Sequence, residues 1–192
     1  SAYIVRKSAI SLLSTMATRQ PTVALACRCR PQICNTLDMT PRIIDGIEGL
    51  KAVVGEHLGY SDYLEITQER VNQFAEATGD HQWIHVDAER CKRESPFGAP
   101  VAHGFLTVSL LPAIFESAIA MPGFGMVLNY GLNKVRFPAP VPVGSRLRGR
   151  LVLQAVDAVE GGFQLTWDVT VERDGEAKPV CVAEFLMRCY PG

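Results

Sequence analysis

The chain of 192 residues has no strong excess of either charge. It carries 19 lysines and arginines against 20 aspartates and glutamates, for a formal net charge of -1. Because proteins bind nucleic acids largely through clustered basic side chains, this balance argues against a nucleic-acid partner. Apolar residues make up 47% of the sequence, which excludes a disordered chain and favours one globular domain.

Cysteine lacks the density of a small secreted disulfide scaffold and the paired spacing of a metal knuckle. The six cysteines fall into two groups of three that lie far apart in the sequence. This usage is typical of a reducing compartment, so we expect a cytoplasmic protein. The cysteines are Cys27, Cys29, Cys34, Cys91, Cys181 and Cys189.

A long unbroken apolar run is also missing. The stretch from Gly104 to Met121 carries a single charge, at Glu116, but prolines and glycines in and around it break the apolar sequence. A membrane-spanning helix needs about 20 continuous apolar residues. We therefore expect no membrane span and interpret the stretch as a helix buried inside the protein. The interrupting residues are Pro96, Gly98, Pro100, Pro112, Pro122, Gly123 and Gly125.

The first 38 residues differ in kind from the rest, since they are serine-rich, basic and without a helical or strand period. This composition is typical of a transit peptide or an unstructured leader. Met39 offers an equal alternative, in which it is the start and the upstream stretch lies outside the fold. We expect a leader at 1–38 and a folded domain at 39–192. If the leader is a transit peptide, the location is mitochondrial or another organelle.

Hydrophobic periodicity predicts an α+β domain. Thr67 is a candidate N-cap for an amphipathic helix that ends at Gly79. Further along, apolar and polar residues alternate over 146–153, 163–172 and 180–190, as in half-buried strands connected by hairpins. We expect a mainly antiparallel sheet that curls around one long buried helix.

The segment after the amphipathic helix crowds two carboxylates and two imidazoles into positions 80–87. One interpretation is structural: Gly79 and Asp87 cap helices, and the other polar groups make a turn. The functional interpretation is that Asp80 and His85 converge on one water, which the carboxylate holds while the imidazole transfers a proton. Both interpretations stay open on spacing alone.

A zinc site is a further alternative, because the segment from His81 to His85 resembles the His-Glu-x-x-His pattern of metalloproteases. Gln82 replaces the glutamate that would act as the general base, and Gly79 indicates a break in the helix that zinc binding would need. We therefore predict that no metal takes part. A third imidazole, His103, is a candidate ligand, although a structural histidine is the more usual role before a buried helix.

Gly104 stands where the buried helix is expected to begin. Its free N–H would lie at the positive end of the helix dipole, where it can stabilise an oxyanion. A tight turn is the alternative. A water-activating pair close to such a donor strengthens the catalytic interpretation.

Three separated motifs carry a resemblance to a known family, and together they cover about residues 45 to 190. They are Thr78-Gly79-Asp80-His81-Gln82-Trp83-Ile84-His85-Val86-Asp87; Pro96-Phe97-Gly98 with Ala102-His103-Gly104-Phe105; and the segment from Asn129 to Gly144. In these motifs the chain resembles the MaoC-like hot-dog hydratases, in the branch related to nodulation protein N.

The resemblance implies a single hot-dog fold and the hydration of trans-2-enoyl thioesters to (R)-3-hydroxyacyl products. It implies that Asp80 and His85 are the catalytic pair and that the Gly104 N–H is the oxyanion donor. Candidate positioning residues are Gln82, His103 and Asn129. The expected substrate is an acyl-CoA thioester, no further cofactor is expected, and a homodimer is expected because a single hot-dog unit leaves sheet edges open.

The chain departs from the broader hydratase pattern in two places. Gln82-Trp83 stands where Asn-Pro is common, and Pro112 stands where related hydratases often have a serine. Two alternatives to a hydratase therefore remain. One is a hot-dog thioesterase, for which Glu116 is the only carboxylate on the expected helix, and the other is a non-catalytic acyl-thioester binding protein.

Overall fold

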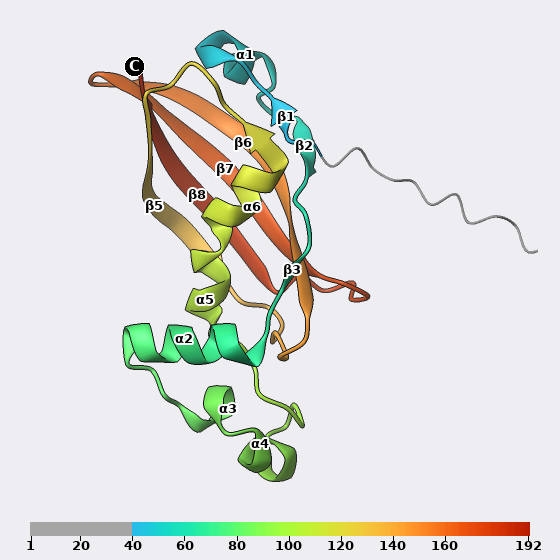
Figure 1. Ribbon diagram of the computed structural model, residues 1–192. Helices are drawn as coiled ribbons and strands as arrows, with labels where there is room; N and C mark the ends of the chain where they lie inside the picture. The colour runs from blue at the N-terminus through green and yellow to red at the C-terminus, as the bar shows by residue number, and fades with distance from the viewer. Residues whose placement is uncertain (1–39) are drawn as a thin grey trace, which may run out of the picture. The chain divides into compact units, whose positions relative to one another are not determined.

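The computed structural model describes residues 40–192, so the predicted leader at 1–38, with Cys27, Cys29 and Cys34, lies outside the described residues. The described residues build one antiparallel sheet in the order β2-β6-β7-β8-β5, with the short strand β3 also paired to β6 (Figure 1). The bounds are β2 (His57–Tyr60), β3 (Leu64–Glu65), β5 (Met126–Arg136), β6 (Arg146–Val159), β7 (Gly162–Arg173) and β8 (Cys181–Tyr190). Two-residue strands β1 (Arg42–Ile43) and β4 (Ile119–Ala120) form a separate parallel pair.

The strands β6, β7 and β8 confirm the predicted alternation. Buried apolar residues of all three strands face the same side of the sheet, and polar residues face the other side. The turns between the strands contain Gly161 and Gly175, whose φ angles of 74° and 78° lie in the left-handed region that glycine adopts without strain. The sheet therefore has one apolar inner face and one polar outer face.

The inner face is covered by the predicted apolar helix, which the structure divides into α5 (Gly104–Ser109) and α6 (Leu111–Ala118) (Figure 1). The division falls at Leu110, because Pro112 has no N–H with which to continue the helical hydrogen-bond ladder. The expected fold class is confirmed, with this interruption in the central helix.

The core lies between α6 and the sheet. Trp167 on β7 is fully buried, and the ring of Phe115 on α6 meets it edge-on at 5.0 Å between centroids. Phe185 on β8, the register neighbour of Trp167, also packs against Phe115, at 5.7 Å between centroids. Aromatic pairs of this kind contribute about 0.5–1.5 kcal/mol beyond the area they bury. Together they fix the height of the helix above the sheet.

The remaining helices precede α5 in the sequence. They are α1 (Gly46–Ala52), α2 (Gln68–Thr78), α3 (Trp83–Val86) and α4 (Ala88–Glu94), and the last three lie together at the N-terminal end of α5 (Figure 1). Across residues 40–192, none of the helices is both long enough and apolar enough to cross a membrane.

Close packing of α6 on β6 leads to a first prediction, at Gly149. A Cβ atom added there would collide with the side chain of Ile114 on α6. We expect Gly149→Ala to lower the free energy of unfolding by about 1–3 kcal/mol, because overpacking outweighs the smaller entropic gain of replacing glycine. Chemical denaturation measures the change.

The control is a double-mutant cycle with Ile114→Ala, which removes the side-chain atom that the added Cβ would meet. Strictly additive losses of stability in the double variant would contradict the packing argument.

Candidate active site

Helix α2 positions Asp80 in the candidate site. Its N-cap is Thr67, whose Oγ1 accepts a hydrogen bond from the N–H of Arg70 at 3.2 Å, as the sequence predicts. Its C-cap is Gly79, with a left-handed φ of 75°. Because glycine adopts this conformation at little cost, the chain turns sharply there and Asp80 begins the loop that follows.

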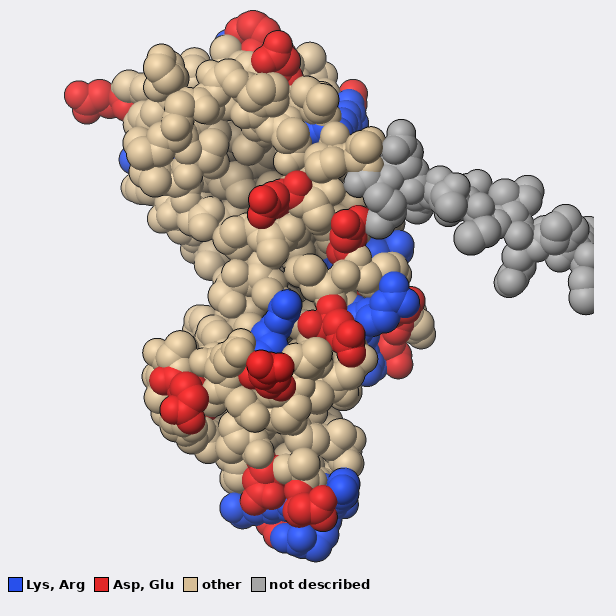
Figure 2. All heavy atoms as spheres, viewed as in Figure 1, with Lys and Arg blue, Asp and Glu red and all other residues tan. Residues whose placement is uncertain are grey.

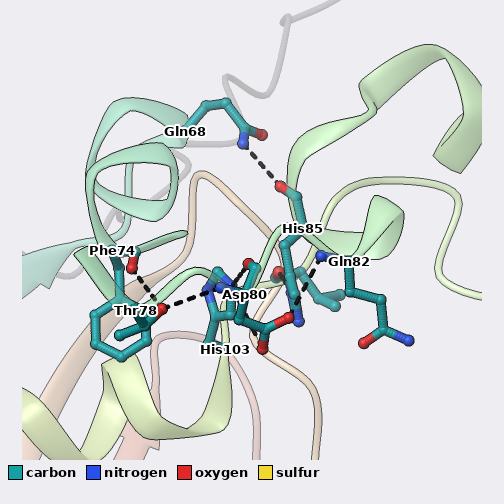
Figure 3. A network of polar contacts seen from close by, with 8 residues as sticks. Gln68, Phe74, Thr78, Asp80, Gln82, His85 and His103 are labelled. Carbon is teal, nitrogen blue, oxygen red and sulfur yellow. Dashed lines mark hydrogen bonds and ion pairs between the residues drawn. The ribbon is translucent and has the colours of Figure 1, made fainter. Parts of the chain in front are cut away.

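The Asp80 side chain is held by its own loop. Its Oδ1 accepts a hydrogen bond from the backbone N–H of Gln82 at 3.4 Å, a turn typical of aspartate. Figure 3 shows the side chain of Gln82 pointing away from Asp80. The predicted positioning role of Gln82 therefore rests on its backbone N–H.

His85 lies on α3 and is almost fully buried, at 7% exposure. Its Nδ1 lies 2.6 Å from the carbonyl oxygen of Val101, and the backbone carbonyl of His85 accepts a bond from Gln68 Nε2 at 2.8 Å. Because a carbonyl oxygen can only accept, Nδ1 must carry the hydrogen. In neutral His85 the other nitrogen, Nε2, therefore has a free lone pair.

Burial sets the protonation state of His85. Loss of hydration lowers the pKa of the imidazole below its ordinary value of 6.5, and the neighbouring His103 lowers it further. The hydrogen bond to Val101 and the charge of Asp80 act in the opposite direction and are outweighed. His85 is therefore a neutral base around pH 7.

His103 joins the two candidate catalytic residues. Its Nε2 donates to the backbone carbonyl of Asp80 at 2.9 Å, and its ring stacks on that of His85 at 3.7 Å between centroids (Figure 3). The residue is 3% exposed, and its Nδ1 has no hydrogen-bond partner within residues 40–192. The predicted positioning role of His103 gains direct support from these contacts.

The three side chains converge. Ligand-type atoms of Asp80, His85 and His103 all lie within 4.8 Å of one another. One water can bridge a carboxylate and an imidazole at this separation, because each hydrogen bond spans about 2.8 Å. The sequence prediction that Asp80 and His85 approach each other thus agrees with the geometry.

The same trio offers oxygen and nitrogen donors that suit a transition metal. This trio differs from the zinc-binding pattern considered for the segment from His81 to His85, because His81 is exposed and lies 3.7 Å from Glu76. His81 and His85 do not share a helix, since α2 ends before Gly79 and α3 begins at Trp83. The absence of a metal from the reaction stays a prediction.

Gly104 is the first residue of α5, directly after His103. Its backbone N–H is among those that a helix leaves without an internal partner. A Cβ at this position would lie 2.8 Å from the ring of Phe137, so any other residue would force that ring to move. A pocket of about 290 Å³ adjoins the residue and is lined on its other sides by Phe97, Thr107 and Phe137 among others.

The other residues noted in the sequence lie outside the cluster of Asp80, His85 and His103. Asn129 is exposed on β5 opposite Met187, and within the described part of the chain no hydrogen bond or ion pair connects it to Asp80 or His85. Trp83 stacks under the guanidinium of Arg90 at 4.3 Å. Pro112 and Glu116 are exposed on α6. The role of Asn129 stays a prediction.

Comparisons with known proteins show the family of the chain. The MaoC like domain family matches residues 50–174. A 3-hydroxyacyl-thioester dehydratase Z of Mycobacterium tuberculosis is 53% identical over 148 residues, which cover 77% of this chain and 97% of that protein. Nodulation protein N of Rhizobium leguminosarum bv. viciae is 46% identical over 136 residues, covering 69% and 84%.

Among solved structures, the (R)-hydratase from A. caviae involved in PHA biosynthesis superposes with a TM-score of 0.58. It is 20% identical, and the match covers 71% of this chain and 97% of that one. At this identity the similarity shows the fold.

The second prediction concerns the pKa of His85, which its buried environment lowers. We expect its ring resonances in an NMR titration to report a pKa below 6.5. His103→Gln should raise that pKa, because it removes the neighbouring imidazole that lowers it. Because the unfolded chain binds the proton more readily, acidification below about pH 6.5 should also destabilise the fold.

The spectrum of His85→Gln assigns the signal, since it lacks that resonance alone. A pKa at or above the ordinary value in the wild-type protein would contradict the neutral base.

Proposed function

The chain belongs to the MaoC-like dehydratase family and has its hot-dog fold, and from this premise we propose that Asp80 and His85 are the acid–base pair of the enzyme. The enzyme is a hydro-lyase, as the dehydratase and hydratase names of its relatives indicate. We propose trans-2-enoyl-CoA thioesters as substrates and (R)-3-hydroxyacyl-CoA thioesters as products, in a reversible reaction.

One observation carries the proposal: a ring nitrogen of His85 lies within 4.8 Å of an Asp80 carboxylate oxygen, and Nδ1 of the same ring is already bonded to Val101, which leaves Nε2 free. In the hydration direction, a water held by Asp80 attacks C3 of the enoyl thioester while His85 Nε2 accepts its proton. The resulting imidazolium returns a proton to C2. One positioned acid–base group of this kind contributes about 10²–10⁴-fold to the rate.

Gly104 supplies the second part of the mechanism. As the oxygen of the thioester gains enolate character, the N–H of Gly104 donates a hydrogen bond to it. The residue follows His103 directly, so this donor is tied to the same cluster that holds the catalytic pair. One such donor contributes about 10²–10³-fold.

The positioning residues act through the catalytic pair. His103 fixes the backbone of Asp80 and supports the ring of His85, and the N–H of Gln82 orients the Asp80 carboxylate. Because one His85 nitrogen handles both protons on one side of the substrate, water and proton add to the same face of the double bond.

The third prediction concerns catalysis. Purified wild-type protein should convert crotonyl-CoA with loss of enoyl absorbance and without release of free thiol. Asp80→Asn and His85→Ala should each lower kcat by at least about 10²-fold, because each removes one partner of the bridging water. Coupling to an (S)-specific 3-hydroxyacyl-CoA dehydrogenase should yield no NADH.

The matched control is His81→Ala, an exposed histidine of the same loop that takes no part in the cluster. Its activity should equal that of the wild type, and pretreatment with EDTA should change neither. Free thiol in place of hydration would identify the thioesterase alternative, and binding without turnover would identify the acyl-thioester binding protein.

A homodimer is the second part of the proposal, and the edge strand β5 supports it. Within the described residues β5 pairs on one side alone, with β8, and its apolar side chains lie open on both faces of the strand. Figure 2 shows little charge on the surface over β5. An exposed apolar edge of this length favours pairing with a second copy of the chain. The exposed residues are Met126, Val127, Leu128, Tyr130 and Leu132.

The fourth prediction follows. Light scattering at micromolar concentration should give twice the 21.0 kDa of one chain. Leu128→Lys should shift the protein to the monomer, because it places a charge on the edge that the two copies share. Val54→Lys, an equally exposed valine before β2, should leave the dimer intact. A monomeric and fully active wild-type protein would overturn the homodimer.

A further inference from the structure

The outer face of the sheet carries a ladder of arginines on β6. Arg146, Arg148 and Arg150 alternate along the strand and face away from the helices, opposite residues of β7. The first two each have a carboxylate: Arg146 pairs with Asp174 at 3.3 Å, and Arg148 donates two bonds to Glu172 at 2.9 and 3.0 Å.

The third arginine, Arg150, has no acidic residue opposite it on β7. Arg150 is paired in register with Thr170, a neutral residue at the position where the ladder would place an acid. The side chain is half-buried, and across residues 40–192 it makes no hydrogen bond, ion pair or ring contact. A partly dehydrated guanidinium whose five donors have no partner among the described residues attracts an anion from outside the chain.

A second arginine lies at the far end of the same row. Thr170 is opposite Val182 on β8, and Val182 is opposite Arg136 on β5. The guanidinium of Arg136 bonds to the backbone carbonyl of Val135 and, within the described part of the chain, to no carboxylate. Three strand spacings separate the two arginines, about 14 Å, with small side chains between them.

Arg136 and Arg150 line one pocket of about 800 Å³, which also contains His57, Lys134, Asp168 and Glu184. Its two acids are already engaged. Asp168 accepts a bond from Gln154 at 2.7 Å, and Glu184 bonds Asn133 and Lys134. The bond from Asn133, followed by the charge of Lys134, holds the pKa of Glu184 below its ordinary value. Lys134 compensates the charge of Glu184, whereas Asp168 bonds only the neutral Gln154 among the described residues, so the two arginines leave the pocket with an excess of positive charge.

We propose that this pocket binds a phosphate ester, with Arg150 and Arg136 as its anion ligands. The planar fork of guanidinium matches two phosphate oxygens, and two arginines suit a group with several negative oxygens. A volume of this size accommodates a nucleotide-sized molecule. The ligand is therefore a nucleotide phosphate, carried either by the coenzyme A end of a thioester or by a separate nucleotide.

The test is calorimetric titration with pyrophosphate and with adenosine 3′,5′-bisphosphate. The wild type should bind both, and Arg150→Gln and Arg136→Gln should each weaken binding at least about tenfold. Thr170→Glu is the sharpest variant, because it completes the ladder with an internal carboxylate while keeping both arginines. It should abolish binding. Arg148→Gln, which loses an arginine that already has its own carboxylate, should bind as the wild type does.

Thermal unfolding confirms that each variant is folded. The proposal is overturned if the folded wild type binds neither probe, or if Thr170→Glu and Arg150→Gln bind as tightly as the wild type. These measurements need no turnover, so they stand apart from the proposed reaction. The source of the phosphate is read from KM. If Arg150→Gln raises the KM for crotonyl-CoA but not the KM for the N-acetylcysteamine thioester, the site binds the coenzyme A end of the substrate. If the KM values of Arg150→Gln equal those of the wild type, the site binds a separate nucleotide.

Discussion

The hydrogen bond from His103 to the backbone carbonyl of Asp80 is the contact on which the site depends. It connects the loop after α2 with the residue directly before α5, 23 positions further along the chain. The stacking of His103 on His85 adds α3 to the same cluster. Without this connection, Asp80 would stand on an exposed loop with two long bonds, from its own N–H to Thr78 Oγ1 at 3.5 Å and from the N–H of Gln82 to its carboxylate at 3.4 Å. One buried ring thus holds the carboxylate, the imidazole and the oxyanion donor in a common frame.

This arrangement has a cost in stability. The Nδ1 of His103 is buried without a partner within residues 40–192, and a buried polar atom without a hydrogen bond costs about 1–3 kcal/mol. His85 adds to the cost at acid pH, because its lowered pKa means that the folded state resists protonation. Both penalties fall on residues that touch the candidate water site. They are offset by the packing of Trp167, Phe115 and Phe185, which lie in the core away from the cluster.

The sequence predicts those parts of the fold and of the candidate site that local patterns determine. The alternation in β6, β7 and β8 and the cap at Gly79 are local, and the structure confirms them. The strand β5 was missed, because an edge strand with apolar residues on both faces has no clean alternation. The convergence of His103 with Asp80 depends on tertiary contacts that no spacing encodes. The break at Leu110 was foreseeable from Pro112, since proline cannot continue a helix through its own nitrogen.

The two faces of the sheet show why one strand can serve unrelated purposes. In β6 the inner residues, such as Leu147, Gly149 and Leu151, are fixed by the need to fit α6. The outer residues alternate with them and are free of that constraint, so their charges follow other requirements. A strand that only needed solubility would pair each arginine with an acid across the strand, as Arg148 and Glu172 do. The neutral Thr170 opposite Arg150 departs from that rule at one position, and the departure falls inside a pocket. An unpaired half-buried charge lowers stability. Binding of an anionic ligand by Arg150 explains why the neutral Thr170 stands opposite it.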